Sequence, residues 1–124
     1  MKREMELVYK ILEFTENKDD FIDPVLPEIQ GFDGITICYH VKILAQAGLV
    51  EAKDWSTDDG PTWVLTHMTN KGHDFFENLK QESIWGAIKS EFKEASLDTI
   101  ISVSKQLSEG WAKKKVTALL AENS

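Results

Sequence analysis

The 124-residue sequence predicts an α+β, mostly helical fold, a winged-helix domain with a C-terminal helical extension. Two observations predict it. The elements run in the order helix, short extended segment, helix, β-hairpin and helix, and the last third of the chain has helical periodicity throughout. We expect residues 1–82 to form the winged-helix-like domain. Residues 83–124 then form a helical extension that packs on this domain or builds a dimer interface, within a single structural unit.

The first helix is expected over residues 3–16. Its charged side chains cluster on one side of a helical wheel and apolar side chains occupy the rest, as in an amphipathic helix with a broad buried face. After it, Pro24 and Pro27 exclude a helix interior. The stretch around these prolines is therefore a loop, which leads into a short extended piece at Ile29–Gln30.

Boundary signals mark the next helix and the hairpin. Asp33 has the side chain of an N-cap, the apolar periodicity runs from Ile35 to Ala47, and Gly48 suits the turn that ends a helix. Strands are expected over residues 49–55 and 62–68, which are rich in Val, Leu, Trp and Thr. The six residues between them form the hairpin turn, at the place of the wing in a winged helix. Trp55 and Trp63 flank this turn and are expected to pair across the hairpin.

A helix-turn-helix has two helices before the hairpin, and only one long helix is evident here. We expect the supporting helix either as a single turn near Phe21–Val25, or through a bend hidden within residues 32–47.

Helices account for the rest of the sequence. Thr69 caps a helix that runs to about Lys80, and Ser96 caps a later one. Gly110 is expected to break that later helix before a terminal helix over residues 111–122. A homodimer interface is expected to use apolar residues of this region, namely Trp85, Ile88, Phe92, Ile100 and Trp111.

Composition limits the function classes. Lys and Arg number 14 against 21 Asp and Glu, a formal net charge of −7, and such a charge repels nucleic acids and anionic membranes at long range. No apolar run approaches the roughly 20 residues that span a bilayer, and the charged N-terminus lacks the apolar region of a signal peptide. We therefore expect a soluble, cytoplasmic protein with no membrane partner. The single Cys38 agrees with a reducing compartment.

One face of the helix after Asp33 is a candidate DNA-reading surface. Ile37, Val41 and Leu44 share a buried face, and four residues project from the other side. Among these, Lys42 suits phosphate or guanine, and Gln46 suits adenine. The alternative is an ordinary solvated face, because one basic residue is few for a specific complex. The candidate DNA-binding residues are Ile35, Tyr39, Lys42 and Gln46.

The wing tip is expected at Asp58, Asp59 and Gly60, and its two carboxylates argue against DNA. Many winged helices carry Lys or Arg there to reach the DNA backbone or minor groove. Residues 30–68 hold two lysines against five carboxylates, a net of −3. The basic run Lys113–Lys115 spreads around a helix, so it is read as a solvated terminus.

Neither a metal site nor a catalytic site is predicted. Cys38, His40, His67 and His73 have side chains that suit zinc, but none of them forms a CxxC or HxxxH pair. Cys38 and His40 are two residues apart on a helix and point apart, so they do not form a nucleophile and base. We expect His40 to bond a backbone carbonyl at the edge of the core. No cofactor and no enzymatic activity are expected.

The segment Tyr39–Val50, with its Ala-Gly-Leu turn, resembles the recognition-helix end of winged-helix regulators, and Met68–Phe76 resembles the junction after the wing. Together with the N-terminal Met-Lys-Arg-Glu-Met-Glu-Leu and with Trp85, the segments Tyr39–Val50 and Gly72–Phe75 resemble an uncharacterised family of small bacterial and phage proteins that carry a domain of unknown function. The resemblance implies a winged-helix-like fold and a phage or prophage context. It supplies no activity and no catalytic residue.

The sequence thus leads to two functional hypotheses. The first is a dimeric winged-helix DNA-binding regulator of bacterial or phage origin. The second is an acidic protein–protein interaction module on the same scaffold, such as a phage-encoded modulator or inhibitor of a host factor, without DNA binding.

Overall fold

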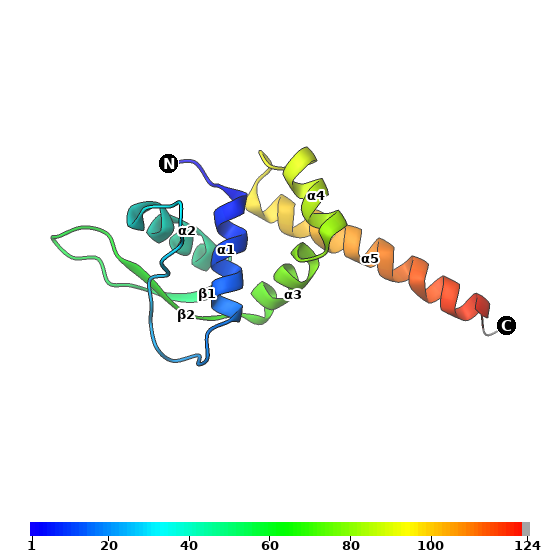
Figure 1. Ribbon diagram of the computed structural model, residues 1–124, viewed down its shortest axis with the longest axis horizontal. Coiled ribbons are helices and arrows are strands. Elements are labelled where there is room, and N and C mark those ends of the chain that lie inside the picture. Colours follow the sequence, from blue (N-terminus) through cyan, green and yellow to red (C-terminus); the bar gives the residue numbers. More distant parts are fainter. Residues whose placement is uncertain (123–124) are drawn as a thin grey trace. The chain divides into compact units, whose positions relative to one another are not determined.

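A computed structural model describes residues 1–122, and within them the chain is α+β, with five helices and one two-stranded antiparallel sheet (Figure 1). The chain divides into two compact units, residues 1–76 and the residues from 77 onward. The sequence predicted a boundary after residue 82. The elements of the first unit are α1 (Met5–Glu16), α2 (Gly34–Gln46), β1 (Val50–Asp54), β2 (Trp63–Met68) and most of α3 (Asn70–Leu79); those of the second are the end of α3, α4 (Glu82–Glu91) and α5 (Leu97–Glu122).

The core of the first unit is built on the apolar faces of α1 and α2. The α1 face predicted from the helical wheel is buried, and the rings of Tyr9 and Phe76 form a T-shaped pair with centroids 5.2 Å apart. The buried residues of α1 are Met5, Leu7, Val8, Ile11, Leu12 and Thr15.

Both predicted ends of α2 are confirmed. The Asp33 carboxylate accepts a hydrogen bond from the Thr36 N–H at 2.8 Å, which satisfies a donor of the first turn. At the other end Gly48 has a φ of +79°, the left-handed conformation that glycine adopts without strain. The Leu49 N–H then bonds the Leu44 carbonyl, and the Leu49 side chain is fully buried.

A single threonine joins the end of α2 to the start of α3. The Thr69 hydroxyl donates to the Gly48 carbonyl at 2.6 Å and accepts from the Gly72 N–H at 3.0 Å, so its predicted capping role is confirmed. The Thr69 N–H also donates to the Leu49 carbonyl. Because the Gly48–Leu49 turn leads into β1 and Thr69 follows β2, these bonds close the base of the hairpin.

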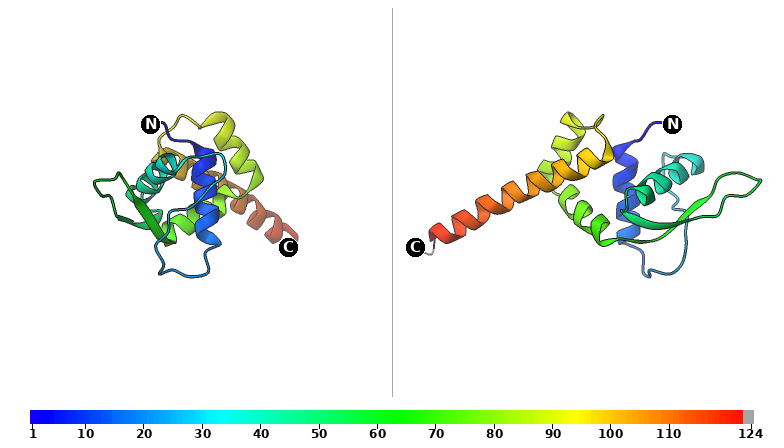
Figure 2. Two further views of the ribbon diagram at one scale, coloured as in Figure 1. Left: turned by 60° about the vertical axis from the view of Figure 1, so that its left-hand side comes forward. Right: turned by 180° about the vertical axis from the view of Figure 1, so that it is seen from behind.

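The predicted hairpin is present, with strands slightly shorter than expected. The register pairs Trp63 with Asp54, and the Trp55 N–H bonds the Thr62 carbonyl, so Trp63 lies opposite Asp54 instead of Trp55. The expected pairing of the two tryptophans is therefore wrong. In both views of Figure 2 the hairpin tip stands clear of the other elements of the first unit.

The extended piece before α2 lies at Val25, and the prediction of Ile29–Gln30 is wrong. The Val25 N–H and carbonyl both bond Leu65 of β2, at 2.9 and 2.8 Å, so Val25 adds a single-residue bridge to β2. Val25 is flanked by Pro24 and Pro27 but has a backbone N–H of its own, and this N–H donates to β2. Ile29 makes no strand pairing, and its carbonyl accepts a turn hydrogen bond from the Phe32 N–H.

No supporting helix is present in residues 17–33. Residues 21–25 form bends that end at the bridge, and α2 runs unbroken from Gly34 to Gln46, so neither form expected for this helix occurs. The prolines and the use of Val25 by the sheet explain the absence, because both remove donors that a helical turn needs.

In the second unit α4 and α5 pack against each other. Ser96 caps α5 as predicted, since its hydroxyl accepts from the Thr99 N–H at 3.1 Å. The expected break at Gly110 is wrong, because α5 is continuous from Leu97 to Glu122. Glycine lowers helix stability but does not forbid helical dihedrals, and good helix formers surround it. None of the helices in residues 1–122 is long and apolar enough to cross a membrane.

Candidate interaction surface

The two faces of α2 lie as the sequence predicted. Ile37, Val41 and Leu44 are buried. The four candidate DNA-binding residues are on the other side: Ile35 is 62% exposed, Lys42 and Gln46 are exposed, and Tyr39 is half-buried. The rings of Tyr39 and its neighbour His40 meet in a T-shaped contact, with 5.6 Å between centroids.

The N-terminal end of α2 carries a carboxylate. The Asp33 side chain accepts from Thr36, and this hydrogen bonding lowers the pKa of Asp33 below its usual value of 3.8. Asp33 is therefore charged at neutral pH. In helix-turn-helix proteins the N-terminal residues of the recognition helix approach the bases. Here the positive end of the helix dipole is already occupied by an anion of the chain itself.

Lys42, the one basic residue among the candidates, lies near another carboxylate. Asp54 of β1 has a pKa below its usual value, chiefly because it accepts hydrogen bonds from Ser56, and the charge of Lys42 lowers this pKa further. The two opposite charges partly cancel. Lys42 therefore offers a phosphate less positive potential than an isolated lysine.

The hairpin tip is a tight two-residue turn. Thr57 and Gly60 exchange two backbone hydrogen bonds of 3.0 Å each, and Gly60 has a φ of +135°, a conformation that favours glycine. Asp58 and Asp59 are the two exposed residues of the turn. Trp55, beside Asp54, is 51% exposed. We call Asp54, Trp55, Asp58 and Asp59 the hairpin patch.

The charges of this region are on its surface. The two lysines and five carboxylates of residues 30–68 are all exposed, which leaves a net of −3 facing solvent. Lys53 is the only Lys or Arg of the hairpin, residues 50–68. Such a surface attracts Lys and Arg side chains and repels phosphates. The set comprises Lys42, Lys53, Asp33, Glu51, Asp54, Asp58 and Asp59.

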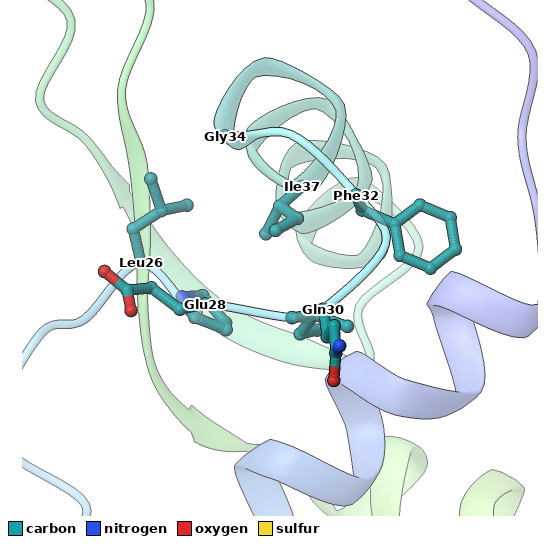
Figure 3. Close-up of a pocket in the computed structure, with 8 residues that line it drawn as sticks. Leu26, Glu28, Gln30, Phe32, Gly34 and Ile37 are labelled. Carbon is teal, nitrogen blue, oxygen red and sulfur yellow. The ribbon is translucent and has the colours of Figure 1, made fainter.

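An open hollow of about 720 Å³ lies beside the first turn of α2, along the loop that precedes this helix (Figure 3). Its lining is polar and apolar in nearly equal parts, with Leu26, Ile37 and Phe32 among the apolar side chains. Glu28 and Gln30 supply its polar groups. This lining offers shape and one carboxylate, but neither a nucleophile nor a histidine.

The residues considered for metal binding or nucleophilic catalysis contact separate elements. The Cys38 sulfur accepts from the Trp63 N–H at 3.0 Å, whereas His40 bonds the backbone of Glu4 and Thr36. His67 lies beside Thr66, and His73 is exposed. In residues 1–122 no three potential ligands come together. The expected bond of His40 to a backbone carbonyl is confirmed at Thr36.

The residues expected at a dimer interface divide into two groups. Ile88 and Ile100 have no exposed surface. Trp85 and Phe92 are half-buried, and Trp111 is 56% exposed. The amine of Lys89 lies 5.1 Å from the Trp85 ring centre, and that of Lys115 lies 4.9 Å from the Trp111 ring centre. Of the five, the two tryptophans and Phe92 therefore have exposed surface.

Sequence reasoning assigned no role to Phe21 and Ile22, beyond a turn of helix. They are 70% and 67% exposed on the loop between α1 and Val25. The signal that could have found them is two large apolar residues between Asp20 and Asp23, without a helical or strand period that would bury them.

Comparison with known proteins finds one family model and one relative. The family, described as hypothetical protein (DUF2513), matches residues 2–98, a span that includes α2 and the whole hairpin. An uncharacterized protein of Haemophilus influenzae (strain ATCC 51907 / DSM 11121 / KW20 / Rd) is 32% identical over 110 residues, which cover 88% of this chain and 93% of that protein. No solved structure matches the chain.

Proposed function

We propose that this chain, which belongs to the hypothetical protein family DUF2513, is a non-catalytic interaction module on a winged-helix scaffold, which binds a basic surface of a protein partner. The membership agrees with the resemblance noted in the sequence. The proposal concerns a cytoplasmic protein of a bacterium, phage or prophage, acting as a modulator or inhibitor of a host factor.

The winged-helix scaffold is supported by topology. Val25 bridges β2 on the edge opposite β1, so it takes the place of the short strand that precedes the helix-turn-helix in a winged helix. The helix α2 closes at Gly48 and leads directly into the hairpin, which then serves as the wing. The scaffold departs from the usual form in one respect, because a loop replaces the supporting helix.

The observation that carries the proposal is the acidic hairpin patch. The patch combines the exposed Trp55 with three exposed carboxylates, on the hairpin whose tip stands clear of the rest of the first unit in Figure 2. Aromatic side chains are enriched at the centres of protein interfaces, and complementary charges speed encounter. The carboxylate of Asp33, the N-cap residue of α2, contributes a further negative charge.

Charge reversal at the hairpin tests the proposal. The Asp58→Lys/Asp59→Lys variant changes the patch, and Glu109→Lys/Glu122→Lys on α5 makes the same change of net charge elsewhere. Proteins retained from a host lysate at about 0.1 M salt are quantified for each bait. We expect a partner retained by the native chain and by the α5 variant, but lost by the hairpin variant. Equal retention by all three baits would contradict the proposal.

A second candidate is a dimeric DNA-binding regulator, favoured by the exposure of Tyr39, Lys42 and Gln46 along α2. Selection of the purified protein against random duplex DNA tests it. Enrichment of a palindrome, lost in Lys42→Ala/Gln46→Ala with unchanged thermal stability, would establish this function in place of the first.

A further inference from the structure

Phe21 and Ile22 form an exposed apolar pair on the loop between α1 and the sheet. Their exposed fractions are 70% and 67%, and no other large apolar side chain within residues 1–122 is more exposed than Phe21. Two adjacent side chains of this size at such exposure leave apolar surface in water that association with a partner would remove.

This loop has a defined shape. The Asp20 carboxylate accepts from the N–H groups of Ile22 and Asp23, both at 2.8 Å. The Lys18 amine donates to the Asp23 carbonyl at 2.8 Å and lies 3.7 Å from Asp20, and only 9% of the Lys18 side chain is exposed. These bonds fix the backbone on both sides of the apolar pair. A preformed loop loses little conformational entropy when it binds.

The ring of Phe21 is also oriented by a contact with β2. It meets the His67 ring of β2 edge-on, with centroids 6.3 Å apart and planes at 87°. This contact holds Phe21 against the sheet, while 70% of its surface stays in solvent. The loop therefore presents an aromatic anchor in a fixed direction, like the rigid anchors of protein interfaces.

The charge around the pair selects the kind of partner. Residues 17–23 contain three carboxylates and one lysine, and that lysine is turned into the loop against Asp20 and the Asp23 carbonyl. The exposed Asp19 and Asp23 side chains then flank the apolar pair. Anionic lipid would be repelled by them, and a second copy joined through the same loop would bring like charges together.

We propose that residues 17–23 are a docking loop, whose Phe21 and Ile22 side chains enter an apolar pocket rimmed by Lys or Arg on a protein partner. The inference deepens the proposed function and rests on it, because both require a basic protein partner. It assigns the apolar anchor to a loop that is separate in sequence from the hairpin patch.

Site-specific photocrosslinking tests the docking loop. A benzophenone amino acid replaces Phe21 in the full chain, which is expressed in the cells that naturally encode it, and a control carries the same group at Leu120, which is 66% exposed on α5. We expect an adduct specific to position 21, cross-linked at an apolar site with Lys or Arg around it. An adduct with a second copy or with lipid, or no adduct beyond that of the control, would overturn the proposal.

Affinity measurements with the purified adduct partner complete the test. Phe21→Ser/Ile22→Ser is expected to weaken binding about thirtyfold or more, as for interface anchors. Asp19→Asn/Asp23→Asn is expected to weaken it less and to reduce its salt dependence, and Leu120→Ser should leave it unchanged. The mutated side chains are exposed, so thermal melts should coincide. Unchanged affinity of the Phe21→Ser/Ile22→Ser variant would refute the docking loop.

The hairpin variant separates the two proposals. If Asp58→Lys/Asp59→Lys loses the partner while Phe21→Ser/Ile22→Ser keeps it, the docking loop is wrong and the proposed function stands. If only the loop variant loses the partner, the docking loop is supported and the hairpin patch is not its contact. If both keep the partner, both proposals fail.

Discussion

The backbone N–H of Glu4 donates a hydrogen bond to Nε2 of His40 at 2.9 Å, across 36 positions of sequence. Nδ1 of the same ring lies 2.8 Å from the Thr36 carbonyl, to which it can only donate. The ring is therefore assigned as neutral, with its proton on Nδ1. Glu4 is the N-cap residue of α1 and its own side chain makes no capping bond, so the fully buried imidazole ties the start of α1 to the middle of α2.

This bond predicts a loss of stability in mild acid. Burial lowers the pKa of His40 below its usual value of 6.5, so the unfolded chain binds a proton more readily than the folded chain. The stabilisation is complete above the unfolded-state pKa and is lost as pH falls through it toward the folded-state pKa. Urea unfolding should give a free energy of unfolding that falls from about pH 7.5 to about pH 5.5. A His40→Gln variant with the same pH dependence would show that another group is responsible.

Gly72→Ala is expected to be strongly destabilising. A Cβ at Gly72 in α3 would overlap the Leu49 carbonyl oxygen and come within 2.6 Å of Met68 Cγ. The carbonyl belongs to the backbone that closes the hairpin base, so it cannot yield cheaply. Thermal or urea unfolding should report a loss of about 2 kcal/mol or more. A variant with native stability would mean that α3 packs farther from the hairpin base than described.

Gly110→Ala is expected to have the opposite effect. Gly110 lies inside α5, and no atom stands within 4 Å of an added Cβ. Alanine should therefore stabilise the helix by up to about 1 kcal/mol and raise the helical circular dichroism signal. A decrease in helicity would indicate that the chain turns at this position.

Neutralising the acidic residues near α2 tests whether charge is what opposes DNA binding. The Asp33→Asn/Asp54→Asn/Asp58→Asn/Asp59→Asn variant changes the surface charge of residues 30–68 from −3 to +1, by the removal of four negative charges. Asparagine still caps a helix, so α2 should persist. We expect the variant to bind duplex DNA more tightly than the native chain, in a salt-sensitive manner, measured by fluorescence anisotropy. Equal binding by both proteins would remove electrostatics as the explanation.

Local chemistry made parts of this structure predictable. The capping bonds of Asp33, Thr69 and Ser96 each reach three residues along the chain, and Gly48 acts through its own backbone conformation. Each of these roles was assigned correctly from the sequence. Glycine at position 110 misled because it lowers helix stability without preventing a helix.

Contacts between distant segments were not predictable from local patterns. The bridge of Val25 with Leu65 joins residues 40 positions apart in the sequence. The bond of Glu4 with His40 joins residues 36 positions apart. The exposure of Phe21 could not be predicted for the same reason, because it depends on how the loop lies against His67. For the candidate surface, the identity of the outward residues of α2 followed from helical periodicity. The partial cancellation of Lys42 by Asp54 did not, because it arises between a helix and a strand.

The threonine bonds at the hairpin base have a mechanical consequence. Thr69 is bonded to both Gly48 and Leu49 on one side and to Gly72 on the other, so the two strands enter and leave the hairpin from a fixed clamp. The base of the hairpin is therefore held in place, and the amplitude of its bending should increase from the base toward the tip. Amide exchange should accordingly be slow around residues 49 and 69 and fast at the tip. A partner that binds Asp58 and Asp59 would contact a hairpin whose base is fixed. Any conformational change on binding would then be confined to the few residues of the turn.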